Sequence, residues 1–174
     1  MVTTMFRSRK AYYFFGFLCT VLGFVLDRIT KILATGLLGK PDIILIPGVL
    51  QFHYLENTGA AFSLLNGQFT FFFITTPILC IVILFLLSKL PYDNRRYFPL
   101  WLIGFLMLAG ALGNLYDRIA YRYVIDFIYF SLINFPVFNV ADIYVTCGLI
   151  VFVFLYIFFY KENELEVFYR KKEQ

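Results

Sequence analysis

Four long stretches of the chain contain no charged residue and consist mainly of apolar side chains. They are Ala11–Leu26, Phe69–Leu87, Tyr97–Tyr116 and Ile143–Tyr160. A helix needs about 20 apolar residues to cross the hydrocarbon core of a bilayer. The pattern therefore predicts a membrane all-α fold with four transmembrane helices. We place these spans at about 11–33, 69–88, 97–117 and 142–160.

The first stretch is short, and it reaches spanning length only if the helix continues through Asp27, Arg28 and Lys31. A cleaved signal peptide is the alternative, because basic residues precede the apolar run. The run, however, is followed by charged residues at helical spacing and not by a small-residue cleavage site. Asp27 and Lys31 are four residues apart, which places an acid and a base on one helix face. We therefore favour a helix that stays in the protein.

Lysine and arginine near the span ends indicate the orientation, since basic residues are enriched on the cytoplasmic side. Ten of the 15 lie on one side, at Arg7, Arg9, Lys10, Lys89, Arg95, Arg96, Lys161, Arg170, Lys171 and Lys172. The other five lie on the opposite side, at Arg28, Lys31, Lys40, Arg118 and Arg122. Both termini are therefore predicted to be cytoplasmic, in agreement with an even number of spans. Segments 35–68 and 120–140 are predicted to be extracytoplasmic.

The first extracytoplasmic segment contains two short runs typical of β-strands. Ile43–Ile46 and Val49–Tyr54 are rich in β-branched and aromatic residues, and Pro47 and Gly48 separate them. We expect a small extracytoplasmic β-sheet on the membrane surface. The second segment is expected to be a connecting loop, and the tail after Tyr160 a solvated helix. The Phe71–Phe73 stripe is expected to face lipid.

The composition agrees with a membrane protein and excludes other classes. The chain has 174 residues, of which 61% are hydrophobic and 15% charged, and its mean hydropathy is +0.78. These values exclude a disordered chain, a collagen-like repeat and a secreted disulfide scaffold. We predict one integral membrane domain, residues 1–174. The net charge of +4 does not indicate nucleic-acid binding, because the basic residues lie at span ends.

Histidine and cysteine offer little chemistry here. Cys19, Cys80 and Cys147 each lie within an apolar run and are expected to be small buried hydrophobic residues. His53 is the single histidine, which excludes a histidine-rich zinc site and does not support a Ser-His-Asp triad. It is expected to be an ordinary strand residue.

The polar residues of the spans are predicted to meet at one depth, near the outer surface. They come from spans one, three and four and from the segments between spans: Asp27, Lys31, Asn57, Asn114, Asp117, Arg118, Asp126, Asn139 and Asp142. Asn139 and Asp142 fit a helix N-cap with an acid three residues later. Asp27 with Lys31, and Asp117 beside Arg118, are expected to be ion pairs or hydrogen-bonding supports. Small residues near Asn114 are expected to let helices approach closely.

The available chemistry is that of carboxylates. Two carboxylates close together share a proton, so that one activates water while the other protonates a carbonyl oxygen. Asp126 and Asp142 are a plausible pair for such aspartic-protease chemistry, and from spacing alone Asp117 competes with Asp126. The alternative is a small proton- or ion-coupled transporter subunit, which would place polar residues along the full depth of the spans.

Five sequence blocks occur in an order that resembles a known family. They are Asp27-Arg28-Ile29-Thr30-Lys31, Asn57-Thr58-Gly59-Ala60-Ala61-Phe62-Ser63, Gly110-Ala111-Leu112-Gly113-Asn114-Leu115-Tyr116-Asp117-Arg118, Val124-Ile125-Asp126-Phe127 and Phe138-Asn139-Val140-Ala141-Asp142. Over essentially the whole chain they resemble bacterial lipoprotein signal peptidase, also called signal peptidase II. The resemblance implies an aspartic endopeptidase of the bacterial cytoplasmic (inner) membrane, with its active site facing the extracytoplasmic side. Such an enzyme removes signal peptides from diacylglyceryl-modified prolipoproteins, cutting before the lipidated cysteine.

The resemblance also implies roles for individual residues. Asp126 and Asp142 match the catalytic pair, which settles the competition with Asp117. Supporting or substrate-contacting positions are matched by Asp27, Lys31, Asn57, Gly59, Asn114, Asp117, Arg118 and Asn139. No metal or organic cofactor is required; the expected partners are the prolipoprotein and membrane lipid, no nucleic acid, and the protein is expected to be a monomer.

The chain departs from the family pattern at two positions. Arg28 stands where glutamine is frequent, and Ala109 stands where a second glycine is usual before Gly110. Neither is expected to touch the catalytic carboxylates, although Ala109 is expected to tighten the packing around span three. The N-terminus of span four should favour ionisation of Asp142 over its partner.

Overall fold

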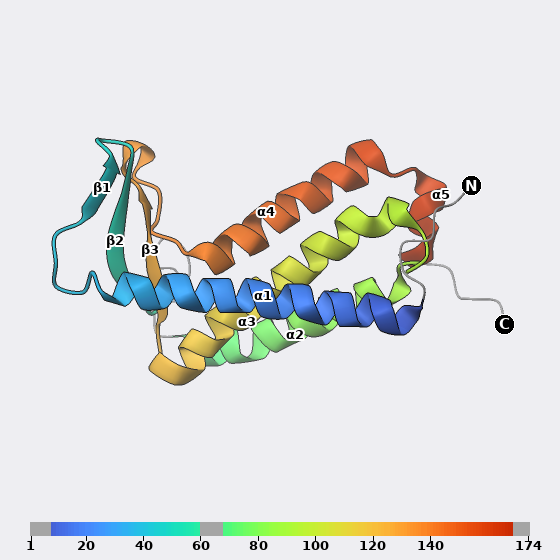
Figure 1. The fold of residues 1–174 in the computed structure, drawn as a ribbon, viewed down its shortest axis with the longest axis horizontal. Helices are drawn as coiled ribbons and strands as arrows, with labels where there is room; N and C mark the ends of the chain where they lie inside the picture. The colour runs from blue at the N-terminus through green and yellow to red at the C-terminus, as the bar shows by residue number, and fades with distance from the viewer. Residues whose placement is uncertain (1–7, 60–67, 169–174) are drawn as a thin grey trace.

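The computed structural model describes residues 8–59 and 68–168. Four long helices run beside one another, and a small sheet lies across one end of the bundle (Figure 1). The helices are α1 (Arg9–Thr35), α2 (Phe69–Lys89), α3 (Phe98–Tyr121) and α4 (Val140–Phe154), and a π-helical turn at Leu155–Phe159 extends α4. Short helical segments are η2 (Arg95–Tyr97), η3 (Ser131–Ile133), α5 (Glu162–Leu165) and η5 (Glu166–Phe168).

Three helical stretches within the described residues are long and apolar enough to cross a membrane. They are Phe69–Lys89, Arg95–Tyr121 and Val140–Phe159. Helix α1 is 27 residues long but is not among them. The molecule is therefore a mostly helical membrane protein with three such stretches, and a membrane span formed by α1 stays a prediction.

Glycines allow α3 to pack closely against both α4 and α1. A Cβ atom on Gly110 would lie 2.5 Å from the Ala141 carbonyl oxygen, and one on Gly113 would lie 2.5 Å from Asp27 Oδ2. Ala109 is fully buried, and its Cβ would lie 2.8 Å from a Cβ added to Gly23 on α1. These close approaches hold α3 at the centre of the bundle, where small residues bring polar groups of neighbouring helices together.

The end of the bundle without the sheet, hereafter the tail end, is closed by the start of α1, by η2 and by α5 (Figure 1). Tyr12 and Trp101 belong to its buried core, and their ring centroids are 4.8 Å apart. Glu164 of α5 forms an ion pair with Arg96 and accepts a hydrogen bond from Tyr97 Oη at its backbone carbonyl, 2.8 Å away. The expectation of a solvated tail helix is confirmed for Glu162 and Asn163, which are exposed on α5, whereas Glu164 is half-buried and holds this helix against η2.

The sheet has three antiparallel strands in the order β1 (Ile43–Ile46), β2 (Leu50–Asn57) and β3 (Val124–Phe130). The first two confirm the expected strands. The third was expected to be loop, although its sequence Val-Ile-Asp-Phe-Ile-Tyr-Phe is as rich in strand formers as β1. In the β2–β3 register Leu55 lies opposite Asp126 and Asn57 lies opposite Val124. The missed strand therefore places Asp126 on a rigid sheet next to Asn57.

Candidate active site

Asp126 and Asp142 come from different elements that meet at the sheet end of the bundle. Asp126 lies within β3 and is 1% exposed. Asp142 is the third residue of α4 and takes part in the capping box of that helix. Its backbone N–H donates to Asn139 Oδ1 at 3.1 Å, and its own Oδ2 accepts the Asn139 N–H at 3.1 Å. The predicted N-cap is confirmed, and it fixes the Asp142 carboxylate at the helix start.

Two asparagines connect these carboxylates. Asn139 Nδ2 donates to Asp126 Oδ1 at 2.6 Å and also lies 3.2 Å from Asn114 Oδ1. Asn114 Nδ2 in turn donates to Asp142 Oδ1 at 2.7 Å. Asn57 Nδ2 donates to the second oxygen of Asp126 at 2.8 Å. Both carboxylates are thus oriented by amide donors within one hydrogen-bonded network.

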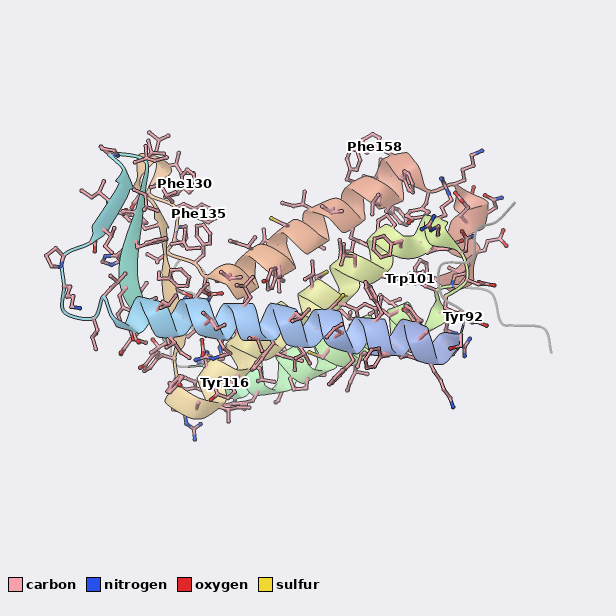
Figure 2. All side chains as sticks on the ribbon, in the orientation of Figure 1. Tyr92, Trp101, Tyr116, Phe130, Phe135 and Phe158 are labelled. Carbon is pink, nitrogen blue, oxygen red and sulfur yellow. The ribbon has the colours of Figure 1, made fainter. Side chains whose placement is uncertain are left out.

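A cavity of about 350 Å³ opens onto both carboxylates. Its polar wall is formed by the two aspartates and by Asn57, Gly59, Asn114 and Arg118. The rest of its wall is mainly apolar and comprises Val124, Phe135, Pro136, Val137, Phe138, Ile143, Thr146 and Cys147. In Figure 2 Phe135 lies beside the sheet, on the side where α4 begins. Cys147 is exposed and not buried as expected.

A buried carboxylate holds the residue directly before each of the two aspartates. Asp27 Oδ1 accepts the backbone N–H of Ala141 at 3.0 Å, and Asp117 Oδ2 accepts that of Ile125 at 3.3 Å. The Asp27 and Asp117 side chains are 0% exposed. We call these two hydrogen bonds the amide tethers. They attach the start of α4 to α1, and strand β3 to α3.

Lys31 joins the two tethers. Its Nζ lies 3.0 Å from Asp27 Oδ2 and 2.9 Å from Asp117 Oδ2, and it donates to Asn114 Oδ1 at 2.8 Å. The predicted Asp27–Lys31 pair is confirmed. Asp117, however, pairs with Lys31 and Arg28 and not with Arg118 as expected. The reason is that α1 crosses α3 at this point and presents two cations to the buried face of α3.

Arg118 instead extends toward the segment that follows β2. Its guanidinium donates to the Gly59 carbonyl at 3.2 Å and lies 4.0 Å above the ring of Phe72. Gly59 N–H donates to Asn57 Oδ1 at 2.9 Å, which orients the amide that reaches Asp126. The expectation that the Phe71–Phe73 stripe only faces lipid is therefore wrong for Phe72. Residues 60–63 of the second motif lie outside the described residues.

The surroundings of Asp126 favour its protonated form. Burial raises the pKa of Asp126 to about 7, and the neighbouring charge of Asp142 acts in the same direction. Hydrogen bonds from Asn57 and Asn139 oppose this change. A carboxyl group with this pKa can hold a proton near neutral pH and release it during a reaction.

The cluster gathers the buried polar residues of the described chain at one end of the helices. Asp27, Lys31, Asp117, Asp126 and Asn139 are the buried polar or charged residues among positions 8–59 and 68–168. The polar residues spaced along the full span depth that a transporter would need are therefore not found among them. Nor does this described part contain a group of three or more His, Cys, Asp or Glu side chains suited to a metal ion.

Comparison with known proteins gives one consistent family. The model of the family described as Signal peptidase (SPase) II matches residues 19–159. The lipoprotein signal peptidase of Clostridium tetani (strain Massachusetts / E88) is 39% identical over 150 residues, covering 84% of this chain and 92% of the relative. That of Lactobacillus johnsonii (strain CNCM I-12250 / La1 / NCC 533) is 33% identical over 161 residues, covering 92% and 100%.

Solved structures agree with the sequence comparison. One bacterial membrane enzyme, solved by the in meso method at 2.3 Å, aligns with a TM-score of 0.72 and 26% identity, covering 100% of this chain and 98% of the other. A second, solved at 1.9 Å, aligns with a TM-score of 0.71 and 30% identity, covering 92% and 99%. The arrangement of helices and sheet is therefore similar to that of bacterial membrane enzymes.

Proposed function

Because this chain belongs to the signal peptidase II family, it is an aspartic peptidase that cleaves signal peptides from prolipoproteins, and we propose that Asp126 and Asp142 are its two catalytic residues. One observation carries this assignment. Both carboxylates line one cavity, and two asparagines connect them through hydrogen bonds of 2.6 and 2.7 Å. Asp117 is engaged otherwise, because its oxygens bind Arg28, Lys31 and the Ile125 amide.

In the proposed reaction the pair begins with a single proton, held by Asp126. Asp142 lies at the N-terminus of α4, where the helix dipole favours a carboxylate. Asp142 removes a proton from a water molecule, and the oxygen of that water attacks the scissile carbonyl carbon. At the same time Asp126 donates its proton to the carbonyl oxygen. The resulting diol collapses when the C–N bond breaks. Asp126 takes back a hydroxyl proton, and Asp142 gives its proton to the leaving amine.

The membrane placement belongs to the same proposal. Helix α1 also crosses the membrane and brings the number of spans to four. Both termini are cytoplasmic, and the sheet end faces the extracytoplasmic side. The distribution of basic residues supports this placement, because Arg9, Lys89, Arg95, Arg96 and Lys161 lie toward the tail end. The sheet and the two catalytic aspartates then lie near the outer surface of the bilayer.

The substrate fits this location. A diacylglyceryl-modified cysteine is held in the bilayer by its acyl chains, so the peptide bond before it lies close to the membrane surface. The mainly apolar wall of the cavity, including Phe135, Val137 and Phe138, suits the lipid-bearing residue, while the polar wall faces the scissile bond. The protein is proposed to act as a monomer in contact with membrane lipid.

The experiment that tests this proposal compares two precursors. Purified protein in phospholipid vesicles is given a diacylglyceryl-modified prolipoprotein and the same precursor with its lipobox cysteine replaced by serine. We expect cleavage of the lipidated precursor alone, with mass spectrometry showing that the mature product begins at the modified cysteine. Equal cleavage of both precursors, or a cut elsewhere, would contradict the proposed specificity.

A further inference from the structure

Arg28 is the outermost cation of the charge network around Asp117. It lies on α1, and its side chain is 11% exposed and paired with Asp117. Its guanidinium carbon lies 4.7 Å above the ring of Tyr116 and 5.9 Å from that of Tyr121. Tyr116 is labelled at the sheet end of α3 in Figure 2. Arg28 is therefore held between an anion and two aromatic rings, in a fixed position.

The charges of the network balance only when Arg28 is included. Asp27 and Asp117 contribute two negative charges, and Lys31 is shared between them. Arg28 supplies the second positive charge, on the Asp117 side. A buried carboxylate without a full counter-charge is costly, and it reduces that cost by changing its partners or by taking up a proton. Glutamine at position 28 could donate a hydrogen bond but could not supply this charge.

The Asp117 carboxylate connects Arg28 to the reaction centre. Asp117 accepts the N–H of Ile125, and Ile125 directly precedes Asp126 on strand β3. We infer that Arg28 is a positioning residue for Asp126, acting through Asp117 and its amide tether. This inference rests on the proposed catalytic role of Asp126. Arg28 thus places the carboxyl group of Asp126, while the cavity residues contact the substrate.

Removing the positive charge should also change the pH dependence of cleavage. Charged and titratable groups surround Arg28 and the catalytic pair on five elements. Helices α1 and α3 contribute Asp27, Lys31, Tyr116, Asp117, Arg118 and Tyr121. The strands β2 and β3 and helix α4 contribute Tyr54, Glu56, Tyr123, Asp126, Asp142 and Tyr144. The pKa of Asp126 is about 7, so the pair loses its shared proton as the pH rises through this value. Cleavage should therefore decline on the alkaline side. Loss of a nearby cation favours the protonated carboxyl, which moves this decline to higher pH.

The test uses three substitutions and one matched control. Arg28→Gln keeps a hydrogen-bond donor without the charge, Arg28→Met removes both, and Arg28→Lys keeps the charge. Arg122→Gln is the control, since it removes a cation at the C-cap of α3, which lies over the Phe73 ring and outside the Asp117 ion pairs with Arg28 and Lys31. For each purified full-length variant in phospholipid vesicles we would measure kcat and KM for the lipidated precursor from pH 5 to pH 9, together with the melting temperature.

We expect Arg28→Met to lower kcat about tenfold with KM changed less than about twofold, because a misplaced catalytic group slows chemistry more than binding. Arg28→Gln should show a smaller loss and an alkaline limb moved up by about half a pH unit, the scale expected from the loss of one partly screened charge. Arg28→Lys should restore most of kcat and the original limb, and Arg122→Gln should match the wild type.

Two results would overturn the inference. The first is an unchanged kcat and pH limb in folded Arg28→Met and Arg28→Gln. The second is a shift of the alkaline limb of the same size in Arg122→Gln. Such a shift would show that the effect comes from the net charge of this end of the molecule and not from Arg28. Asp126→Asn, measured in parallel, separates the role of Arg28 from that of the proposed catalytic pair. If it cleaves normally, the proposed catalytic pair fails; if it is inactive while the Arg28 variants behave as wild type, only the role of Arg28 fails.

Discussion

The two ends of the helix bundle both contain ion pairs between distant segments, but the pairs differ in exposure. At the sheet end the side chains of Lys31, Asp27 and Asp117 are 0% exposed. At the tail end the side chains of Arg96 and Glu164 are 38% and 22% exposed. Water stabilises exposed charges whether or not they are paired, whereas buried charges depend on one another. The sheet end should therefore respond to single substitutions much more strongly than the tail end.

The two ends also differ in what their hydrogen bonds hold. At the tail end Arg96 donates to the Phe159 carbonyl at 2.7 Å, and Tyr160 Oη donates to the Arg96 carbonyl at 2.7 Å. These contacts fasten the π-helical turn at the end of α4 to η2. At the sheet end the corresponding bonds lead to the residues before Asp126 and Asp142. Charged side chains at the tail end hold segments of the chain together, whereas those at the sheet end position the two aspartates that we propose as catalytic.

The largest effect in this comparison is expected for Lys31→Met. Removing the lysine leaves two buried carboxylates without their shared cation, which costs about 3–5 kcal/mol for a buried pair that loses one partner. Thermal unfolding of the purified protein measures this loss, and cleavage of lipidated precursor should fall below detection. A variant with wild-type stability and activity would show that the buried network is dispensable.

Asp117→Asn should have the next largest effect. The asparagine retains an oxygen that can accept the Ile125 amide, but it loses the charge that pairs with Arg28 and Lys31. We expect a fall in melting temperature at least as marked as the fall in kcat. Substrate titration and thermal unfolding together check this. If Asp117→Asn were the one inactivating aspartate substitution, our assignment of the catalytic pair would be wrong.

Two glycine substitutions in α3 compare the packing of this helix at the sheet end and toward the tail end. A Cβ on Gly110 would lie 2.5 Å from a backbone oxygen of α4, which cannot move without shifting Asp142. Gly110→Ala should therefore destabilise by about 1–3 kcal/mol and also reduce kcat. Gly104→Ala is the control toward the tail end, since its Cβ would lie 2.8 Å from one side-chain methyl group of Leu87 and 3.2 Å from the other, and these groups can move aside. Equal loss of activity in both variants would contradict the local role of Gly110.

Glu164→Gln should have the smallest effect. The hydrogen bond from Arg96 lowers the pKa of Glu164, so its charge interacts favourably in the folded protein. The pair is nevertheless partly exposed, and such pairs contribute about 0–1 kcal/mol. We expect a slight fall in melting temperature at neutral pH and unchanged cleavage kinetics. A large loss of activity would mean that the tail end influences the catalytic site.

Much of this arrangement could be predicted from the sequence, because it depends on local patterns. The apolar stretches marked the helices, Asn139 with Asp142 marked the cap of α4, and Ile43–Ile46 marked a strand. The resemblance of five short blocks to signal peptidase II supplied the family, which the family match over residues 19–159 confirmed. Each of these signals can be read from continuous stretches of the chain, without knowledge of distant contacts.

The remaining features depend on contacts between distant residues. Arg28 and Asp117 are 89 positions apart, and the adjacent Arg118 was the simpler expectation for a partner. The amide tethers use the backbone N–H groups of Ile125 and Ala141, which carry no side-chain signature. Strand β3 was missed because Asp126 interrupts its apolar run, although the β-branched and aromatic residues around it could have revealed it.

The most direct test of the central claim is a double-substitution cycle on the catalytic pair. Single-turnover cleavage of lipidated precursor would be measured for Asp126→Asn, Asp142→Asn and the double variant, each shown to be folded by its melting temperature. Two groups that act as one unit are strongly non-additive. We therefore predict that both single variants are inactive and that the double variant falls no further. Substantial cleavage by either single variant would contradict the claim that Asp126 and Asp142 together activate water.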